Sequence, residues 1–271
     1  MIRPAQQLVI AFSLLLPLLL CGRAQSTETI RYAGATTLQR DFMPDAANRF
    51  SAANDVRFQL DGGNTGAGLK ALSAGVIDLA GSGRFLTAKE KSSGLVDHLI
   101  GWDPLVVVVH VTNPIENIRR EDLRRILSGA LRNWNQLGGR DLPILQIAAP
   151  AGSGVHDAVE EVLLDEHQHI SSQAIVSLVV ADADRNVALL PAAFTVTSMS
   201  MVDAEKVKII KVDDTFPTRQ SVAAGTYPMI KPLLLVTKGK PQGRLALFIN
   251  FAKSPEGQAL IANKFFPLTS H

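Results

Sequence analysis

The stretch Gly152-Ser153-Gly154-Val155-His156-Asp157 places three residues capable of chemistry within five positions. A serine hydroxyl near an imidazole and a carboxylate is the residue set of nucleophilic catalysis. The same stretch precedes an apolar run with helical spacing, so it is also typical of a helix start. The first backbone N–H groups of a helix are unpaired and bind anions. The stretch therefore supports two hypotheses, a catalytic serine and an anion-binding site.

The spacing around Ser153 favours the anion site. A nucleophile elbow has the pattern Gly-x-Ser-x-Gly, whereas here the glycines flank the serine directly. His156 and Asp157 are neighbours on one helical turn and point in different directions, so the carboxylate is poorly placed to orient the imidazole. A serine hydrolase using Ser153 remains an alternative, but we expect no enzyme.

Two further turns share this chemistry. Gly34-Ala35-Thr36-Thr37 and the run from Gly62 to Gly68, which contains Thr65, each follow an expected strand and lead into a helix. Glycine lets an anion approach the backbone closely, and serine or threonine hydroxyls add donors. Each turn alone is also an ordinary N-cap. Together, the three turns predict that helix N-termini converge on one oxyanion.

Other sites fit the sequence less well. Gly63 and Gly68 have the spacing of a nucleotide-binding loop, but Leu69-Lys70-Ala71 replaces its Gly-Lys-Ser/Thr ending. The segment from Asp165 to His169 carries potential metal ligands, although such a segment at a helix end is more often a solvated patch. Only 6% of the residues are aromatic, which disfavours sugar stacking. We therefore expect neither a cofactor nor a metal.

Short apolar runs alternate with amphipathic stretches along the chain, which predicts an α/β fold. Two long apolar runs, 105–111 and 232–237, are candidates for strands that cross between two lobes. The other expected strands lie at 29–33, 56–60, 76–80, 142–148 and 207–212. The expected helices lie at 42–52, 68–74, 119–127, 155–164, 244–252 and 255–263. A single doubly wound domain is the alternative arrangement.

The N-terminus has the features of an export signal. Arg3 precedes an apolar segment from Leu8 to Leu20, and small residues around Ala24 suit cleavage, so residues 1–24 are interpreted as a signal peptide. Cys21 is the only cysteine and would be acylated if the protein were a lipoprotein, but Leu20 before it disfavours this. Without the leader, 25 basic residues balance 25 acidic ones. This neutrality disfavours a nucleic-acid partner.

These motifs, taken together, resemble the phosphate-binding proteins of ABC-type phosphate importers, in the type 2 periplasmic-binding-protein superfamily. The resemblance covers nearly the whole mature chain. Its parts are Gly34 to Thr37, Gly66 to Lys70, Ile77 to Ser82, Asn113-Pro114, Leu123 to Gly129, Asn133 to Gly139, Gly152 to Gly154, Tyr227-Pro228, Lys238 to Pro241 and Ser254 to Ala259.

The resemblance implies a fold and a function. It implies two α/β lobes with open sheets flanked by helices, joined by two crossover strands, with lobe I at 26–104 plus 229–271 and lobe II at 105–228. It implies a periplasmic, monomeric protein that captures inorganic phosphate or a related oxyanion and delivers it to an inner-membrane ABC permease. The residues expected to line the cleft are Thr36, Thr37, Thr65, Ser153 and Gly154.

Three positions depart from the family pattern. Gly83 stands where the family has an aspartate that accepts the proton of hydrogen phosphate, Ala149 replaces a phosphate-pairing arginine, and Val155 replaces a threonine. Arg84 is the expected replacement for the arginine, and His156 is a candidate donor in place of the aspartate. The departures also leave open a non-transport sensor or adhesive relative with a degenerate anion site.

Overall fold

The computed structural model describes residues 27–164 and 168–268. The expected signal peptide, Cys21 and the first part of the segment from Asp165 to His169 lie outside the described residues. Within the described part of the chain, no helix is long and apolar enough to cross a membrane.

The first lobe is built on a parallel sheet of strands β1, β2 and β3. β1 (Glu28–Gly34) pairs with both β2 (Val56–Leu60) and β3 (Leu79–Ser82). Its helices are α1 (Thr36–Asp41), α2 (Met43–Ala53), α3 (Thr65–Ser73), α4 (Ala88–Ser92), α9 (Gly243–Lys253) and α10 (Pro255–Ile261). Both α1 and α3 begin directly beyond the carboxyl end of a strand, which is where open α/β sheets bind ligands.

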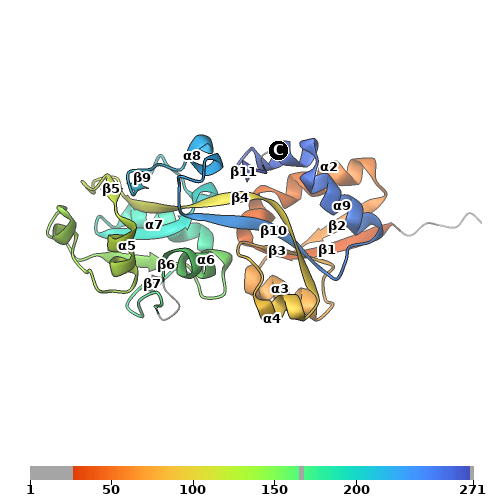
Figure 1. The fold of residues 1–271 in the computed structure, drawn as a ribbon, viewed down its shortest axis with the longest axis horizontal. Helices are drawn as coiled ribbons and strands as arrows, with labels where there is room; N and C mark the ends of the chain where they lie inside the picture. The colour runs from red at the N-terminus through yellow and green to blue at the C-terminus, as the bar shows by residue number, and fades with distance from the viewer. Residues whose placement is uncertain (1–26, 165–167, 269–271) are drawn as a thin grey trace, which may run out of the picture.

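Two long strands connect the lobes (Figure 1). β4 (Leu95–His110) pairs through its first part with β10 (Ile230–Lys238). Through its second part it pairs with β8 (Ala193–Ser198) and β9 (Val207–Val212) of the other lobe. β10 also pairs with β3, and the short β11 (Phe266–Pro267) pairs with β4. The expected crossover strands at 105–111 and 232–237 are therefore parts of β4 and β10.

The second lobe contains β5 (Asn117–Ile118), β6 (Leu145–Ala148), β7 (Ile175–Val176), β8 (Ala193–Ser198) and β9 (Val207–Val212). Its helices are α5 (Arg120–Leu127), α6 (Gly154–Leu163), α7 (Ala183–Leu189) and α8 (Arg219–Ala223), with short 3-10 turns at Trp134–Leu137, Val180–Asp182 and Met199–Met201. β4, β6 and β8 form the centre of this lobe, and helix α6 starts from the loop after β6.

Each lobe has its own apolar core. In the first lobe four phenylalanine rings pack against one another between α2, β2 and α9, most pairs edge to face or tilted and one pair stacked, namely Phe50, Phe58, Phe248 and Phe251. In the second lobe the buried cluster includes Trp134, whose ring meets Phe194 at 87°. Apolar burial is therefore organised separately on each side of the connecting strands, as in two domains.

Some elements differ in their bounds from the sequence-based prediction, and others were not predicted at all. The third strand was expected at 76–80 but lies at Leu79–Ser82, and the strand expected at 142–148 is shortened to Leu145–Ala148. The buried strand β8 and helices α4, α7 and α8 were not predicted. The two-lobed α/β arrangement with crossing strands is as expected, whereas a single doubly wound domain was the wrong alternative.

Candidate oxyanion site between the lobes

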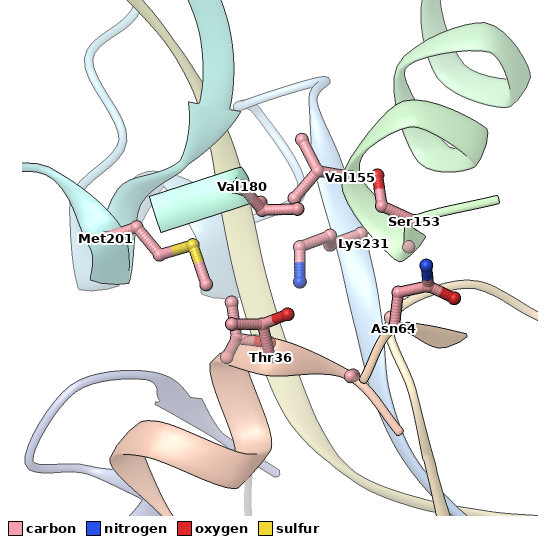
Figure 2. Close-up of a pocket in the computed structure, with 11 residues that line it drawn as sticks. Thr36, Asn64, Ser153, Val155, Val180, Met201 and Lys231 are labelled. Carbon is pink, nitrogen blue, oxygen red and sulfur yellow. The ribbon is translucent and has the colours of Figure 1, made fainter. Parts of the chain in front are cut away.

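A small pocket lies where the two lobes meet. Figure 2 shows Lys231 at its centre, with Thr36 and Asn64 on the first-lobe side and Ser153, Val155, Val180 and Met201 on the second-lobe side. Ala35, Thr37, Gly83 and Gly154 complete the lining. Four of the six residues expected to bind the anion are therefore in the lining, namely Thr36, Thr37, Ser153 and Gly154.

The start of α1 presents backbone donors to this pocket. Ala35 caps the helix without a side-chain hydrogen bond, and the N–H groups of Thr36 and Thr37 have no backbone partner among the described residues. The Thr36 hydroxyl donates to the carbonyl of Gly63 at 3.0 Å. This hydroxyl therefore offers lone pairs, and the N–H groups are the donors available to an anion.

The start of α6 faces the same space from the other lobe. Ser153 is the N-cap, and its hydroxyl oxygen accepts from the backbone N–H of His156 at 3.1 Å. The N–H groups of Gly154 and Val155 have no backbone partner within the described ranges. Ser153 can still donate its own proton, so this helix end provides several donors at the positive end of its dipole.

The positive charge in the pocket comes from Lys231, a residue that sequence analysis did not identify. Its side chain is 1% exposed, and its Nζ lies 3.0 Å from Oδ2 of Asp103, which is 0% exposed. The two residues are direct cross-strand neighbours on β10 and β4. An ammonium has three N–H donors and Asp103 takes one, so the others are available to a ligand.

Thr65 has a different role from the one expected. Its hydroxyl accepts from the backbone N–H of Gly83 at 3.0 Å, and Thr65 is absent from the pocket lining. The N–H of Gly66 donates across the lobes to the carbonyl of Gly152 at 3.0 Å. The N–H of Gly66 is therefore already bonded within the protein and Thr65 lies outside the lining, so the start of α3 offers the pocket fewer backbone donors than the starts of α1 and α6. Asn64 does line it, with its amide directed toward Ser153 (Figure 2).

The expectation that Arg84 neutralises the ligand needs correction. Its guanidinium forms ion pairs with Glu90 and Asp157, each at 2.8 Å, and also donates to the carbonyl of Phe85. These contacts raise the pKa of Arg84, with the Glu90 hydrogen bond as the largest cause. Two carboxylates already satisfy this charge and Arg84 does not line the pocket, whereas Lys231 does.

His156 also lies elsewhere than expected. Its ring borders a separate cavity beneath α6, with Gln146 and Ala149, and its Nδ1 is 3.5 Å from Oδ1 of Asp157. The contact between Ser153 and His156 runs through the backbone N–H of the histidine. The imidazole is therefore not placed as a base for Ser153, and it is not a donor in the oxyanion pocket.

The rest of the lining is apolar or small. Val155, Val180 and Met201, all buried, form the wall opposite Thr36. A Cβ atom built on Gly83 would lie 3.3 Å from Nζ of Lys231, so the glycine allows the ammonium to approach closely. No aspartate or glutamate is among the described residues that line the pocket. Within the described ranges no group of three or more metal-ligating side chains occurs. The pocket thus combines many donors, one cation and no anionic acceptor, which suits a tetrahedral oxyanion.

Comparison with known proteins agrees with this architecture. A family model described as a PBP superfamily domain matches residues 22–256. The phosphate-binding protein PstS of Bacillus subtilis is 26% identical over 92% of this chain and 83% of its own length. That of Borreliella burgdorferi is 25% identical over 96% of this chain and 97% of its own length.

Two solved structures have the same fold. A Clostridium perfringens protein assigned to a phosphate ABC transporter, solved with bound phosphate, superposes with a TM-score of 0.83 at 26% identity, over 89% of this chain and all of its own. An ABC-type phosphate transport receptor of Vibrio cholerae gives a TM-score of 0.76 at 27% identity over the same shares. The expected type 2 fold is thereby confirmed. The chain belongs to the PBP superfamily and is a distant homologue of the phosphate-binding proteins of ABC transporters.

Proposed function

We propose that this protein is a non-enzymatic solute-binding protein that captures inorganic phosphate between its lobes. The observation that carries the proposal is the buried Lys231 ammonium, which lies in a pocket bordered by the free N–H groups at the starts of α1 and α6. The names of the homologues, which are phosphate-binding proteins, support phosphate over other oxyanions.

The binding mode follows from the donors in the pocket. The N–H groups of Thr36 and Thr37 hold the anion from the first lobe, and Ser153 with Gly154 holds it from the second. Lys231 contacts it from the strand that joins the lobes. Hydrogen bonds to a charged group contribute about 1.5–3 kcal/mol each. Since the donors come from both lobes, phosphate stabilises the closed form.

Titration calorimetry with phosphate, arsenate and sulfate tests this proposal on the mature chain. We expect saturable binding of phosphate with one site per chain. If none of the three tetrahedral oxyanions gave a heat of binding, the ligand assignment would be contradicted, whereas the fold assignment would stand. Analytical ultracentrifugation in the same buffer tests the monomeric state that we propose for the free and the bound protein.

The role in the cell is part of the same proposal. The leader 1–24 would direct the chain to the periplasm, where it would deliver phosphate to an inner-membrane ABC permease. Mass spectrometry of the purified periplasmic protein tests this, because cleavage after Ala24 and acylation at Cys21 give different N-termini. Co-purification with an inner-membrane ABC permease from the same cells tests the partner.

A sensor or adhesive protein with a degenerate anion site is the alternative. Gly83, Ala149 and Val155 favour it, because each lacks a polar group that phosphate-binding relatives are expected to use. The buried Lys231 favours capture, because a degenerate site would have no reason to keep a desolvated cation in its pocket. Uptake of labelled phosphate in a strain lacking this gene separates the two roles.

A further inference from the structure

The Arg84 side chain joins the two lobes beside the pocket. Arg84 follows β3 in the first lobe, and its Nε donates to Oδ2 of Asp157 in the first turn of α6 at 2.8 Å. Their side chains are 13% and 24% exposed, so the contact is largely shielded from solvent. We refer to it as the inter-lobe ion pair.

The same guanidinium is held on its own lobe by other groups. Nη1 and Nη2 donate to the two carboxylate oxygens of Glu90 at 2.8 and 2.9 Å, and Nη1 also donates to the carbonyl of Phe85. Glu90 is itself fixed because it caps α4 with Thr87. Arg84 is therefore oriented by the first lobe alone, and only Nε is directed to the second lobe.

Contacts next to this pair require the lobes to be closed. A Cβ atom built on Gly154 would lie 2.9 Å from Cα of Gly83, the residue before Arg84. The N–H of Gly66 bonds the carbonyl of Gly152 at 3.0 Å, and Nη2 of Arg40 bonds the carbonyl of Ser200 at 2.9 Å. Of these cross-lobe contacts, the inter-lobe ion pair is the one that joins two full charges. Hydrogen bonds between ionised groups are the strong ones, so closure gains most from this contact.

From this geometry we propose that Arg84 and Asp157 are positioning residues that set the lifetime of the closed, ligand-bound state. The inference rests on the proposed phosphate site. Glu90 orients the guanidinium in advance, so little side-chain entropy is lost when the lobes meet. Asp157 follows the pocket residues Ser153 and Gly154 on α6, and the pair thereby holds the N–H groups of that helix against the first lobe.

Whether Asp157→Asn strengthens or weakens phosphate binding distinguishes this positioning role from a purely electrostatic effect of the carboxylate. The Asp157 carboxylate is a negative charge near an anion site, so if it acted only through its field, Asp157→Asn would tighten phosphate binding. The inter-lobe ion pair requires the opposite result. Loss of one charge-assisted hydrogen bond should weaken phosphate binding by about tenfold to a hundredfold, through faster dissociation.

The experiment compares D157N with D213N, using inorganic phosphate. Asp213 also pairs with an arginine, Arg120, at 2.7 Å, but within the second lobe. We expect D157N to raise the dissociation rate of labelled phosphate at least tenfold with little change in thermal unfolding temperature, and D213N to leave the rate unchanged. An unchanged or slower rate in D157N, while the wild type binds phosphate, would overturn the inference.

A wild type that binds no phosphate would instead contradict the proposed function. Hydrogen exchange of residues 83–87 in the ligand-free protein then decides the role of the pair, because this segment lies in the lobe opposite Asp157. Faster exchange in D157N than in D213N supports the inter-lobe ion pair, and equal exchange in the two variants overturns it.

Discussion

Replacing Lys231 with methionine should affect both folding and binding, because this ammonium pairs with Asp103 and faces the pocket. The substitution leaves the Asp103 carboxylate buried without its cation, and its Oδ1 already has no hydrogen-bond partner. Breaking a buried ion pair from one side typically costs about 3–5 kcal/mol. We expect the free energy of unfolding of K231M to fall by this amount in urea titrations.

The double variant K231M/D103N separates the two effects. Replacing both partners of a buried ion pair with neutral residues of similar size is often close to neutral for stability. The asparagine oxygen can still accept from the hydroxyl of Ser200, which lies 3.2 Å from Asp103. We therefore expect the double variant to regain most of the lost stability, while phosphate binding stays weakened.

The binding loss should correspond to one charge-assisted hydrogen bond, about 1.5–3 kcal/mol, or about tenfold to 150-fold in Kd. Calorimetry on the double variant measures it without interference from unfolding. Wild-type affinity in K231M/D103N would refute the conclusion that Lys231 contacts the ligand. Wild-type stability in K231M would show that the ion pair between Lys231 and Asp103 does not stabilise the fold.

Three further predictions concern the pocket and its surroundings. A methyl group at Gly154 would lie 2.5 Å from Oγ1 of Thr65, so G154A should weaken phosphate binding at least about tenfold by calorimetry, whereas G62A, whose methyl would meet nothing closer than 3.7 Å, serves as the control. Because no carboxylate among the residues that the structure describes lines the pocket, sulfate should bind within about tenfold of phosphate at pH 8, and a preference above about a thousandfold would reveal an acceptor in the site. The hydrogen bond from Arg84 lowers the pKa of Glu90 below 4.5, so its contribution to stability is present at neutral pH and is lost as the pH falls through the lowered value. The difference in unfolding free energy between wild type and E90Q should shrink below pH 4.5, and a difference that is constant down to pH 3 would contradict this.

Sequence patterns were informative where a single local feature decides the structure. The continuous apolar run at 105–111 lies in the second half of β4, which begins ten residues earlier at Leu95. The Ser254-Pro255 helix start corresponds to the start of α10. β8 was not predicted because it is a buried strand that contains Thr195, Thr197 and Ser198. Polar residues in a short segment are typical of loops, and only burial between β4 and β6 makes this one a strand.

The candidate site also contains residues that local sequence identifies and residues whose contacts only the fold reveals. The N-cap Ser153 and the donors that follow it are local features, and they lie where the helix start indicates. Arg84 was assigned to the ligand because it follows Gly83 and could replace the missing family arginine, and the sequence does not show that two carboxylates already pair with it. The pattern of Thr87 and Glu90 signals the start of α4, but it does not show that Glu90 also turns back to the arginine. Asp157 reaches it from another lobe.

Lys231 illustrates what a single sequence does not show. A lysine at the start of an apolar strand is normally expected to extend its ammonium to solvent. Its burial depends on Asp103, which lies opposite it only because β4 and β10 pair antiparallel in one register. A shift of that register by one residue would turn the lysine to the opposite face of the sheet, away from the pocket. The charge of the site is therefore set by the same two strands that join the lobes, so bending at this junction would move the cation relative to both helix ends.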